Sequence, residues 1–265
     1  MRTFFTIGLL YVAAACGDDL GSFRPAAYVL EGRGGKSELR VFSPDGKEVG
    51  IPIPLALNNV VFGASGNALY GTSQKTDLLK IELNPVRIVR LPGFESFAWM
   101  DRFAVSRNED KILLMGGRDR GRSSGIFEVS LPDGKLRVVL ETATTGFPWR
   151  IGDLAPGAEE ALIELMRIPG GLALLDVASG AITPLGNELW EGSYSPDGRW
   201  LAALDRSTPG RASKRVLIDR KDWSRRRDLG RRVSQLIWSP DSQLLLGAES
   251  REACGHENQL ALEVT

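Results

Sequence analysis

The residues best suited to nucleophilic catalysis surround Ser123. The stretch "GRSSG" at 121–125 satisfies the G-x-S-x-G pattern, and Asp205, Asp219 and His256 follow it in the order of a hydrolase triad. A nucleophile elbow needs a strand before the serine and a helix after it. Here the serine lies between two strand-like segments, in a loop of Gly, Ser and Arg. We therefore predict no catalytic residue at this position.

Two other patterns are similar to ligand-binding motifs but lack essential parts. "GRGGKS" at 32–37 is similar to a phosphate-binding loop, yet Leu30 stands where the first glycine is required and a strand-like "ELRVF" replaces the helix. His256 lies close to Cys254 and Glu257 without the spacing of a recognised metal site. The sequence thus predicts neither a cofactor nor a metal-ligating residue.

The elements that must position such residues repeat along the chain. In "YSPDGRWLAAL" at 194–204 and "WSPDSQLLLGA" at 238–248, a tight turn precedes an apolar strand. Equivalent turns recur roughly every 40 to 45 residues, a period typical of four-stranded propeller blades. The aligned positions are Gly63, Ser106, Ala155, Ser195 and Ser239.

A third copy, "FSPDGKEVGIP" at 42–52, occupies a different place. It follows the strand-like "SELRV" and matches "FEVSLPDGKLRVV", which predicts a turn between the third and fourth strands of a blade. A first blade of three strands then covers about 26–54. The last blade begins near Gln235 and stops after its third strand, "QLALEV". We count six blades, with five as the alternative.

The "SPDG" turns, each followed by an apolar strand, resemble the TolB-type β-propeller repeat over roughly residues 26–265. The resemblance implies an all-β β-propeller of four-stranded antiparallel blades with incomplete terminal blades. TolB carries an α/β domain before its propeller, and residues 16–25 leave no room for one, so we do not expect its partner interactions to carry over. The same repeat covers the hydrolase domain of prolyl-oligopeptidase-like enzymes, for which this chain is too short.

The first residues resemble a bacterial lipoprotein signal. "MRTFFTIGLLYVAAACGDD" places Arg2 before an apolar run at 4–15, and that run of about a dozen residues is shorter than the 20 that a membrane-spanning helix needs. We predict a signal peptide at 1–15, a lipidated Cys16 with a short linker at 16–25, and the propeller at 26–265. Cleavage without lipidation, or a buried apolar segment, are the alternatives. The expected location is the bacterial cell envelope, facing the periplasm or the surface, at the outer membrane.

Composition narrows the classes of partner. The formal net charge is zero with a single histidine, which argues against a nucleic-acid-binding protein. Hydrophobic residues make up 43% of the chain, enough for an ordinary core. A lipidated Cys16 would leave Cys254 without a disulfide partner, so we expect the fold to rest on that core and the membrane to be contacted through the lipid alone.

Basic residues gather in the loops that join the second and third strands of the blades. Antiparallel order puts these loops on the face opposite the "SPDG" turns, and a face of one sign suits an anionic ligand. Solvation of ordinary loops is the alternative. The arginines that we assign to this face are Arg118, Arg120, Arg122, Arg211 and Arg215.

Tryptophans and charges precede the innermost strands and should surround the mouth of the central channel on that same face. Such residues suit ligand or protein recognition, and packing between neighbouring blades is the alternative. They are Trp99, Asp101, Arg102, Trp149, Arg150, Trp190 and Glu191. We favour a non-enzymatic scaffold that binds an envelope protein or an anionic glycan. An envelope lactonase or hydrolase with a metal in the channel remains the alternative.

Overall fold

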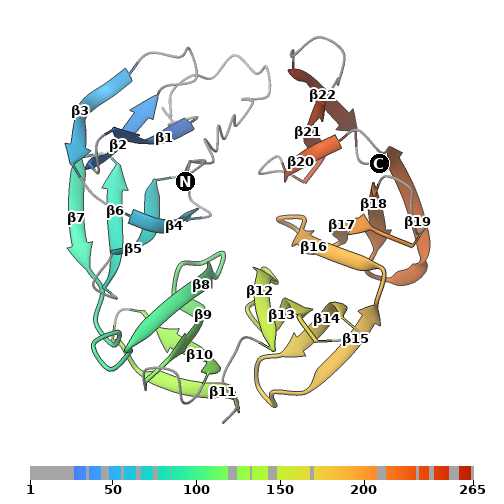
Figure 1. Ribbon diagram of the computed structural model, residues 1–265, viewed down its shortest axis with the longest axis horizontal. Coiled ribbons are helices and arrows are strands. Elements are labelled where there is room, and N and C mark those ends of the chain that lie inside the picture. The colour runs from blue at the N-terminus through green and yellow to red at the C-terminus, as the bar shows by residue number, and fades with distance from the viewer. Residues whose placement is uncertain are drawn as a thin grey trace. The chain divides into compact units, whose positions relative to one another are not determined.

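Every regular element in the described part of the chain is a β-strand (Figure 1). This confirms the all-β class. No helix among the described residues is long and apolar enough to cross a bilayer. The computed structural model describes residues 27–33, 36–42, 48–54, 57–63, 67–73, 77–83, 85–118, 124–131, 133–142, 148–167, 170–207, 213–230, 233–238, 242–250 and 257–263.

The chain divides into two compact units, and the smaller is Met1–Leu91. Its described strands form two antiparallel sheets. The first has the order β1-β2-β3, so that residues 43–47 fall between its last two strands, the place that the sequence predicts for "FSPDG". The second has the order β4-β5-β6-β7. The strands are β1 (Ala27–Arg33), β2 (Lys36–Phe42), β3 (Glu48–Pro54), β4 (Leu57–Phe62), β5 (Ala68–Ser73), β6 (Leu78–Leu83) and β7 (Val86–Arg90).

The larger unit, Pro92–Thr265, holds three four-stranded sheets and one three-stranded sheet among its described residues. Each pairs consecutive strands in antiparallel order. The first two sheets contain β8 (Trp99–Val105), β9 (Lys111–Gly117), β10 (Ser124–Ser130) and β11 (Leu136–Thr142), then β12 (Trp149–Leu154), β13 (Glu160–Leu165), β14 (Gly171–Asp176) and β15 (Ile182–Gly186). The other two contain β16 (Leu189–Tyr194), β17 (Trp200–Asp205), β18 (Lys214–Asp219) and β19 (Asp222–Gly230), then β20 (Val233–Trp238), β21 (Leu244–Ser250) and β22 (Glu257–Glu263).

The middle strands of the two central sheets of this unit, β12–β15 and β16–β19, are apolar on both faces because each of these sheets packs between two others. On β13, Ala161 and Ile163 face the sheet β8–β11, while Leu162 faces the sheet β16–β19. On β17, Ala203 faces back toward β12–β15 and Ala202 faces forward toward β20–β22. Successive side chains of a strand point to opposite sides, so both sets are buried. This explains the nearly continuous apolar runs in the sequence.

The fourth strands are more polar. Most side chains of β19 are exposed, and this strand carries Arg225, Arg226 and Arg227. Charged side chains on an edge strand discourage pairing with another chain. Arg226 also contacts Glu188 at 3.2 Å, which holds the edge to the loop before β16.

The turn after the first strand has one recurring backbone geometry in the four sheets that begin with β4, β8, β12 and β16. Its first residue donates its N–H to the carbonyl of the residue that opens the second strand. Ser195 Oγ also donates to Asp197 Oδ1 at 2.6 Å and accepts from the Trp200 amide at 2.8 Å, so the serine and aspartate of "SPDG" build the turn. The backbone pairs are Gly63 with Ala68 at 2.9 Å, Ser106 with Lys111 at 2.9 Å, Ala155 with Glu160 at 2.8 Å and Ser195 with Trp200 at 2.9 Å.

The fourth residue of this turn adopts a left-handed backbone conformation in four sheets. Gly198 has a φ of 73°, and a Cβ added there would lie 3.2 Å from Pro156 and 3.3 Å from the guanidinium of Arg220. The equivalent residues are Glu109 at 54°, Ala158 at 61° and Ser242 at 65°. Only glycine adopts this conformation without strain.

The first strands share an irregularity near the opposite end. The register of β4, β8, β12, β16 and β20 shifts against the second strand of the same sheet, as in a β-bulge. Within this stretch Asn59 and Glu191 have positive φ values of 49° and 51°. Bulges redirect side chains and often lie beside binding sites.

Candidate functional site

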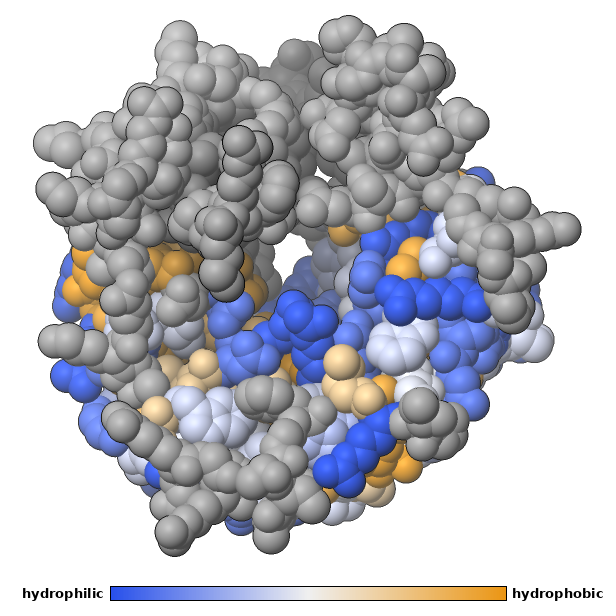
Figure 2. All heavy atoms as spheres, viewed as in Figure 1, coloured by the Kyte–Doolittle hydropathy of each residue, from blue (hydrophilic) through white to orange (hydrophobic). Residues whose placement is uncertain are grey.

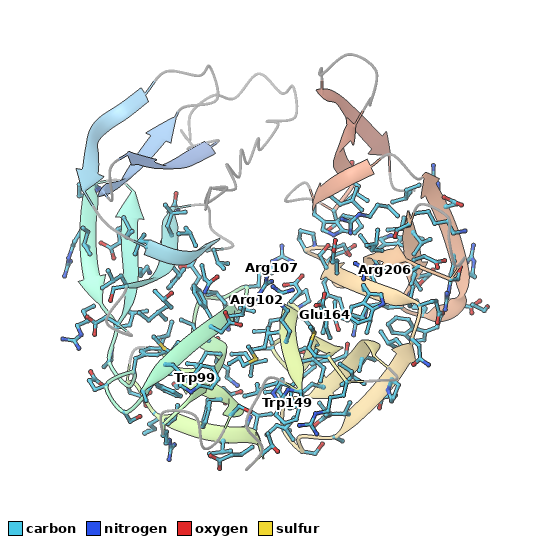
Figure 3. The ribbon with its side chains drawn as sticks, in the orientation of Figure 1. Trp99, Arg102, Arg107, Trp149, Glu164 and Arg206 are labelled. Carbon is cyan, nitrogen blue, oxygen red and sulfur yellow. The ribbon has the colours of Figure 1, made fainter. Side chains whose placement is uncertain are left out.

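The predicted tryptophans and charges of the larger unit lie where its first strands begin. β12 contacts both β8 and β16, so these three strands are neighbours. Hydrophilic side chains gather there (Figure 2), and Arg102 and Glu164 lie close together in Figure 3. We call this set the arginine cluster. Its members are Arg102, Arg150, Arg206 and Arg215 with the carboxylates of Asp101, Glu164 and Glu191.

Glu164 is the buried carboxylate of the arginine cluster, with only 8% of its side chain exposed. It lies on β13 directly opposite Arg150 on β12, and the Arg150 Nη1 atom is 3.8 Å from its Oε2. Its Oε1 accepts a hydrogen bond from the backbone N–H of Glu191 at 2.9 Å. One carboxylate therefore ties an arginine of its own sheet to the bulge of the next sheet.

Glu191 is the second organising carboxylate. Its Oε2 lies 2.8 Å from Arg215 Nη2, and its Oε1 lies 3.7 Å from Arg206 Nη2. The side chain of Arg215 is only 10% exposed, whereas that of Glu191 is 48% exposed. Because a buried guanidinium is costly without an anion, Glu191 holds Arg215 in place and leaves its own outer edge facing solvent.

Arg102 adds a positive charge with no hydrogen-bonded or ion-paired partner among the described residues. Burial lowers the pKa of Arg102, and the nearby charge of Arg150 lowers it further. The carboxylates of Asp101, Glu164 and Glu191 act in the opposite direction without cancelling this effect. The guanidinium stays charged because an arginine pKa starts far above neutrality.

The three predicted tryptophans occupy different environments. Trp149 is 8% exposed and packs in the core between two sheets, and its Nε1 has no hydrogen-bond partner among the described residues. Trp190 is half-buried, donates its Nε1–H to the Asn187 carbonyl at 3.2 Å, and lies 5.1 Å below the guanidinium of Arg206. Trp99 is also half-buried. Only Trp190 and Trp99 therefore offer accessible ring surface.

Of the basic-face arginines, two fall in the described part of the chain. Arg118 is exposed and stacks over Phe127 at 5.5 Å. Arg215 is buried and ion-paired with Glu191, so it holds that carboxylate in the arginine cluster and is not itself exposed to a ligand. Arg120, Arg122 and Arg211 lie outside the described residues. So do Cys16, Ser123, Cys254 and His256, together with the signal peptide.

Sequence reasoning missed Glu164 and Arg206. Glu164 stands in "ALIEL", a run whose pattern predicts a buried strand. Only its pairing opposite Arg150 on β12 indicates that it takes part in the arginine cluster. Arg206 follows β17 directly and reads as an ordinary loop residue. Within the described ranges, no group of three His, Cys, Asp or Glu side chains is placed to hold a metal ion.

No protein-family model matches the chain, and no curated protein matches its sequence. Solved structures match its fold. TolB from Acinetobacter baumannii aligns with a TM-score of 0.64 at 15% identity, over 86% of this chain and 57% of that one. Oligogalacturonate lyase from Vibrio parahaemolyticus aligns with a TM-score of 0.66 at 11% identity, over 97% of this chain and 76% of that one.

An oligogalacturonate lyase in complex with manganese also aligns, with a TM-score of 0.63 at 12% identity over 85% of this chain and 68% of that one. At such identities the likeness establishes architecture. The sheets therefore form a β-propeller, and the fold is TolB-like, as the repeat predicted. The chain spans 57% of the length of the Acinetobacter TolB.

Proposed function

We propose that this protein is a non-enzymatic binding propeller of the bacterial envelope. A lipid on Cys16 would anchor it to a membrane, as the apolar run and the cysteine after it indicate. The arginine cluster would then bind an anionic ligand, either an acidic surface of an envelope protein or an anionic glycan. TolB-like architecture supports a binding role without deciding the partner.

The excess positive charge of the arginine cluster carries this proposal. Four guanidinium groups share three carboxylates, and Arg102 has no ion-pair partner among the described residues. The ion pair of Arg150 is long at 3.8 Å, and 41% of its side chain is exposed. Two arginines are therefore available for a carboxylate, phosphate or sulfate group, which guanidinium groups bind in a bidentate manner.

The accessible tryptophan surface fits the same ligand. Trp190 lies beside Glu191, and Arg206 covers one side of its ring. A sugar ring or an apolar side chain attached to the anionic group can pack against Trp190. The combination of charge and flat apolar surface favours a glycan or protein segment over a simple inorganic ion.

The double variant Arg102→Gln/Arg150→Gln tests this proposal, with oligogalacturonate as the anionic glycan probe and calorimetry as the measurement. We expect the wild-type protein to bind with a clear salt dependence. The variant should bind at least ten-fold more weakly, a loss of about 1.4 kcal/mol or more, with a smaller salt dependence. Both side chains are partly solvated, so the fold should survive, as circular dichroism can check.

The matched control is Lys135→Gln. Lys135 is exposed in the turn between β10 and β11, at the opposite end of the sheets, and its only described ion pair is with Asp133 at 3.0 Å. This variant should bind like the wild type. If the control and the double variant weaken binding equally, the arginine cluster is not the site. Native-membrane cross-linking at position 102 provides the corresponding test for a protein partner.

A metal-dependent envelope enzyme is the second candidate. The observation that favours it is the likeness to the lyase crystallised with manganese. Dialysed protein that retains a stoichiometric divalent ion and converts oligogalacturonate would support this candidate over the binding scaffold. Binding of the glycan without turnover, with or without added manganese, would support the scaffold.

A further inference from the structure

An open surface pocket of about 560 Å³, called the cavity below, lies at the end of the sheets opposite the arginine cluster. Two neighbouring sheets of the larger unit form it. The turn between β16 and β17, the turn between β18 and β19, and the first residue of β13 line its walls. The charged and aromatic lining residues are Glu160, Asp197, Arg199, Arg220, Lys221 and Trp223. A volume of this size suits a small organic molecule.

Arg220 fixes the distance between the two sheets. Its Nη2 donates to Glu160 Oε1 at 2.8 Å and its Nη1 donates to the Gly198 carbonyl at 2.7 Å. Its guanidinium also stacks on the Tyr194 ring at 4.7 Å. The cavity is therefore built on a residue that is held in place from three directions, and it does not depend on a mobile loop.

Both carboxylates of the cavity already have hydrogen-bond donors from the protein. Glu160 Oε1 accepts from the Tyr194 hydroxyl at 2.5 Å as well as from Arg220. Asp197 accepts from Ser195 Oγ at 2.6 Å and from the Arg199 amide at 3.0 Å. Burial raises the pKa of Asp197, but these hydrogen bonds, a further one with Ser242 and the charge of Arg199 outweigh that effect and lower it overall. The hydrogen bonds to Glu160 Oε1 and Asp197 Oδ1 engage one oxygen of each carboxylate and so satisfy part of both negative charges.

The cations of Arg199 and Lys221 are available by contrast. Arg199 stacks over the Trp200 ring at 4.8 Å, which orients its guanidinium. Its charge contributes to the lowered pKa of Asp197, but no hydrogen bond or ion pair from the guanidinium to a described side chain is found. Lys221 is exposed, and its ammonium has no ion-pair or hydrogen-bond partner among the described residues. The charged side chains of the cavity that lack a hydrogen-bonded or ion-paired partner among the described residues are therefore both cations.

An apolar wall lies beside these cations. Leu174 and Trp223 line the cavity and are partly buried against the core between the two sheets. A flat apolar body can pack there while its charged group contacts Arg199 and Lys221. The cavity thus presents a flat surface and two cations at one opening.

We propose that this cavity is a second binding site, specific for a small aromatic carboxylate. The carboxylate contacts Arg199 and Lys221, and the ring lies against Trp223 and Leu174. The site is separate from the arginine cluster because Trp190 lies near the start of β16 whereas Asp197 follows its end.

Titration calorimetry with indole-3-acetate tests the proposal, and two analogues separate its parts. Indole-3-ethanol keeps the ring without the charge, and acetate keeps the charge without the ring. We expect indole-3-acetate to bind with one site per chain, and each analogue to bind at least five-fold more weakly. The variant Arg199→Gln/Lys221→Gln should weaken indole-3-acetate at least five-fold and leave the weak binding of indole-3-ethanol unchanged.

The matched control is again Lys135→Gln, which lies in the β10–β11 turn just as Lys221 lies in the β18–β19 turn. It should leave the affinity unchanged. The proposal is overturned if wild-type protein shows no saturable binding of indole-3-acetate up to about 10 mM. It is also overturned if the control and the double variant lose affinity alike, or if Arg102→Gln/Arg150→Gln, rather than Arg199→Gln/Lys221→Gln, abolishes binding.

Discussion

At the scale of single residues, the same side-chain type serves opposite purposes in this protein. Arg215 and Arg220 are held inside the larger unit by Glu191 and Glu160, where they join neighbouring elements. Arg102, on the other hand, has its charge uncompensated by a contacting anion in the described part of the chain. The composition shows only a net charge of zero. Which arginines bind a ligand depends on which carboxylates the fold places beside them.

Asp153 gives a residue-scale prediction about pH. Its carboxylate accepts from the Tyr194 amide at 2.8 Å and from the Leu154 amide at 2.8 Å, and burial raises its pKa to about 6. The folded protein therefore binds this proton more tightly than the unfolded chain, whose aspartate titrates near 3.9. Stability from this group is greatest below pH 4 and is lost as the pH rises to about 6.

The variant Asp153→Asn removes that titration, so its free energy of unfolding relative to wild type should rise by about 1–3 kcal/mol between pH 4.5 and pH 7.5. Urea unfolding at both pH values measures it. Asp176→Asn is the control. Hydrogen bonds from Ser179 lower the pKa of the exposed Asp176, so its contribution is already complete above pH 4.5. Parallel behaviour of the two variants would contradict the burial of Asp153.

At the scale of elements, the repeat predicts the strands well because turn chemistry and apolar runs are local properties. The turns at Ser106, Ala155 and Ser195 follow from spacing, as do the position of residues 43–47 between β2 and β3 and the three described strands of the last sheet. The side-chain site is less predictable. Trp149 lies at the start of a first strand much as Trp190 does, yet it is buried between sheets. Its neighbours across the sheet interface, such as Met115, decide this, and sequence spacing does not reveal them.

The left-handed residue of the recurring turn gives an element-scale prediction. Gly198→Ala should lower the free energy of unfolding by about 1–2 kcal/mol, because alanine is strained at a φ of 73° and its Cβ would approach Pro156 and Arg220. Glu109→Gly, at the equivalent turn, should be neutral or stabilising by up to about 1 kcal/mol. Chemical denaturation of both variants measures the contrast. Equal losses would show that the two turns are not equivalent.

At the scale of the whole molecule, the proposed role depends on an anchor that presents the propeller at a membrane. The wild-type protein should fractionate with bacterial membranes, and Cys16→Ser should release it or block its processing. Mass spectrometry of the mature N-terminus reads the same outcome directly, since acylation adds the mass of its fatty chains. An unmodified mature cysteine, or a soluble wild-type protein, would contradict the anchor and leave the binding sites unaffected.

The burial of middle strands on both faces has a consequence for how the chain avoids misfolding. On β13, Leu162 and Ile163 face different cores, and a slip of one residue would exchange them for side chains of almost equal hydrophobicity. Such a register slip would therefore expose few apolar side chains and bury few polar ones, so the hydrophobic effect disfavours it only weakly. The penalty must come from the places where the strands reverse or bulge, such as the tight turn at Ser195 and the kink at Glu191. The register of the strands is thus specified at their ends. Substitutions in these turns and bulges should produce chains with misaligned strands more often than substitutions in the core.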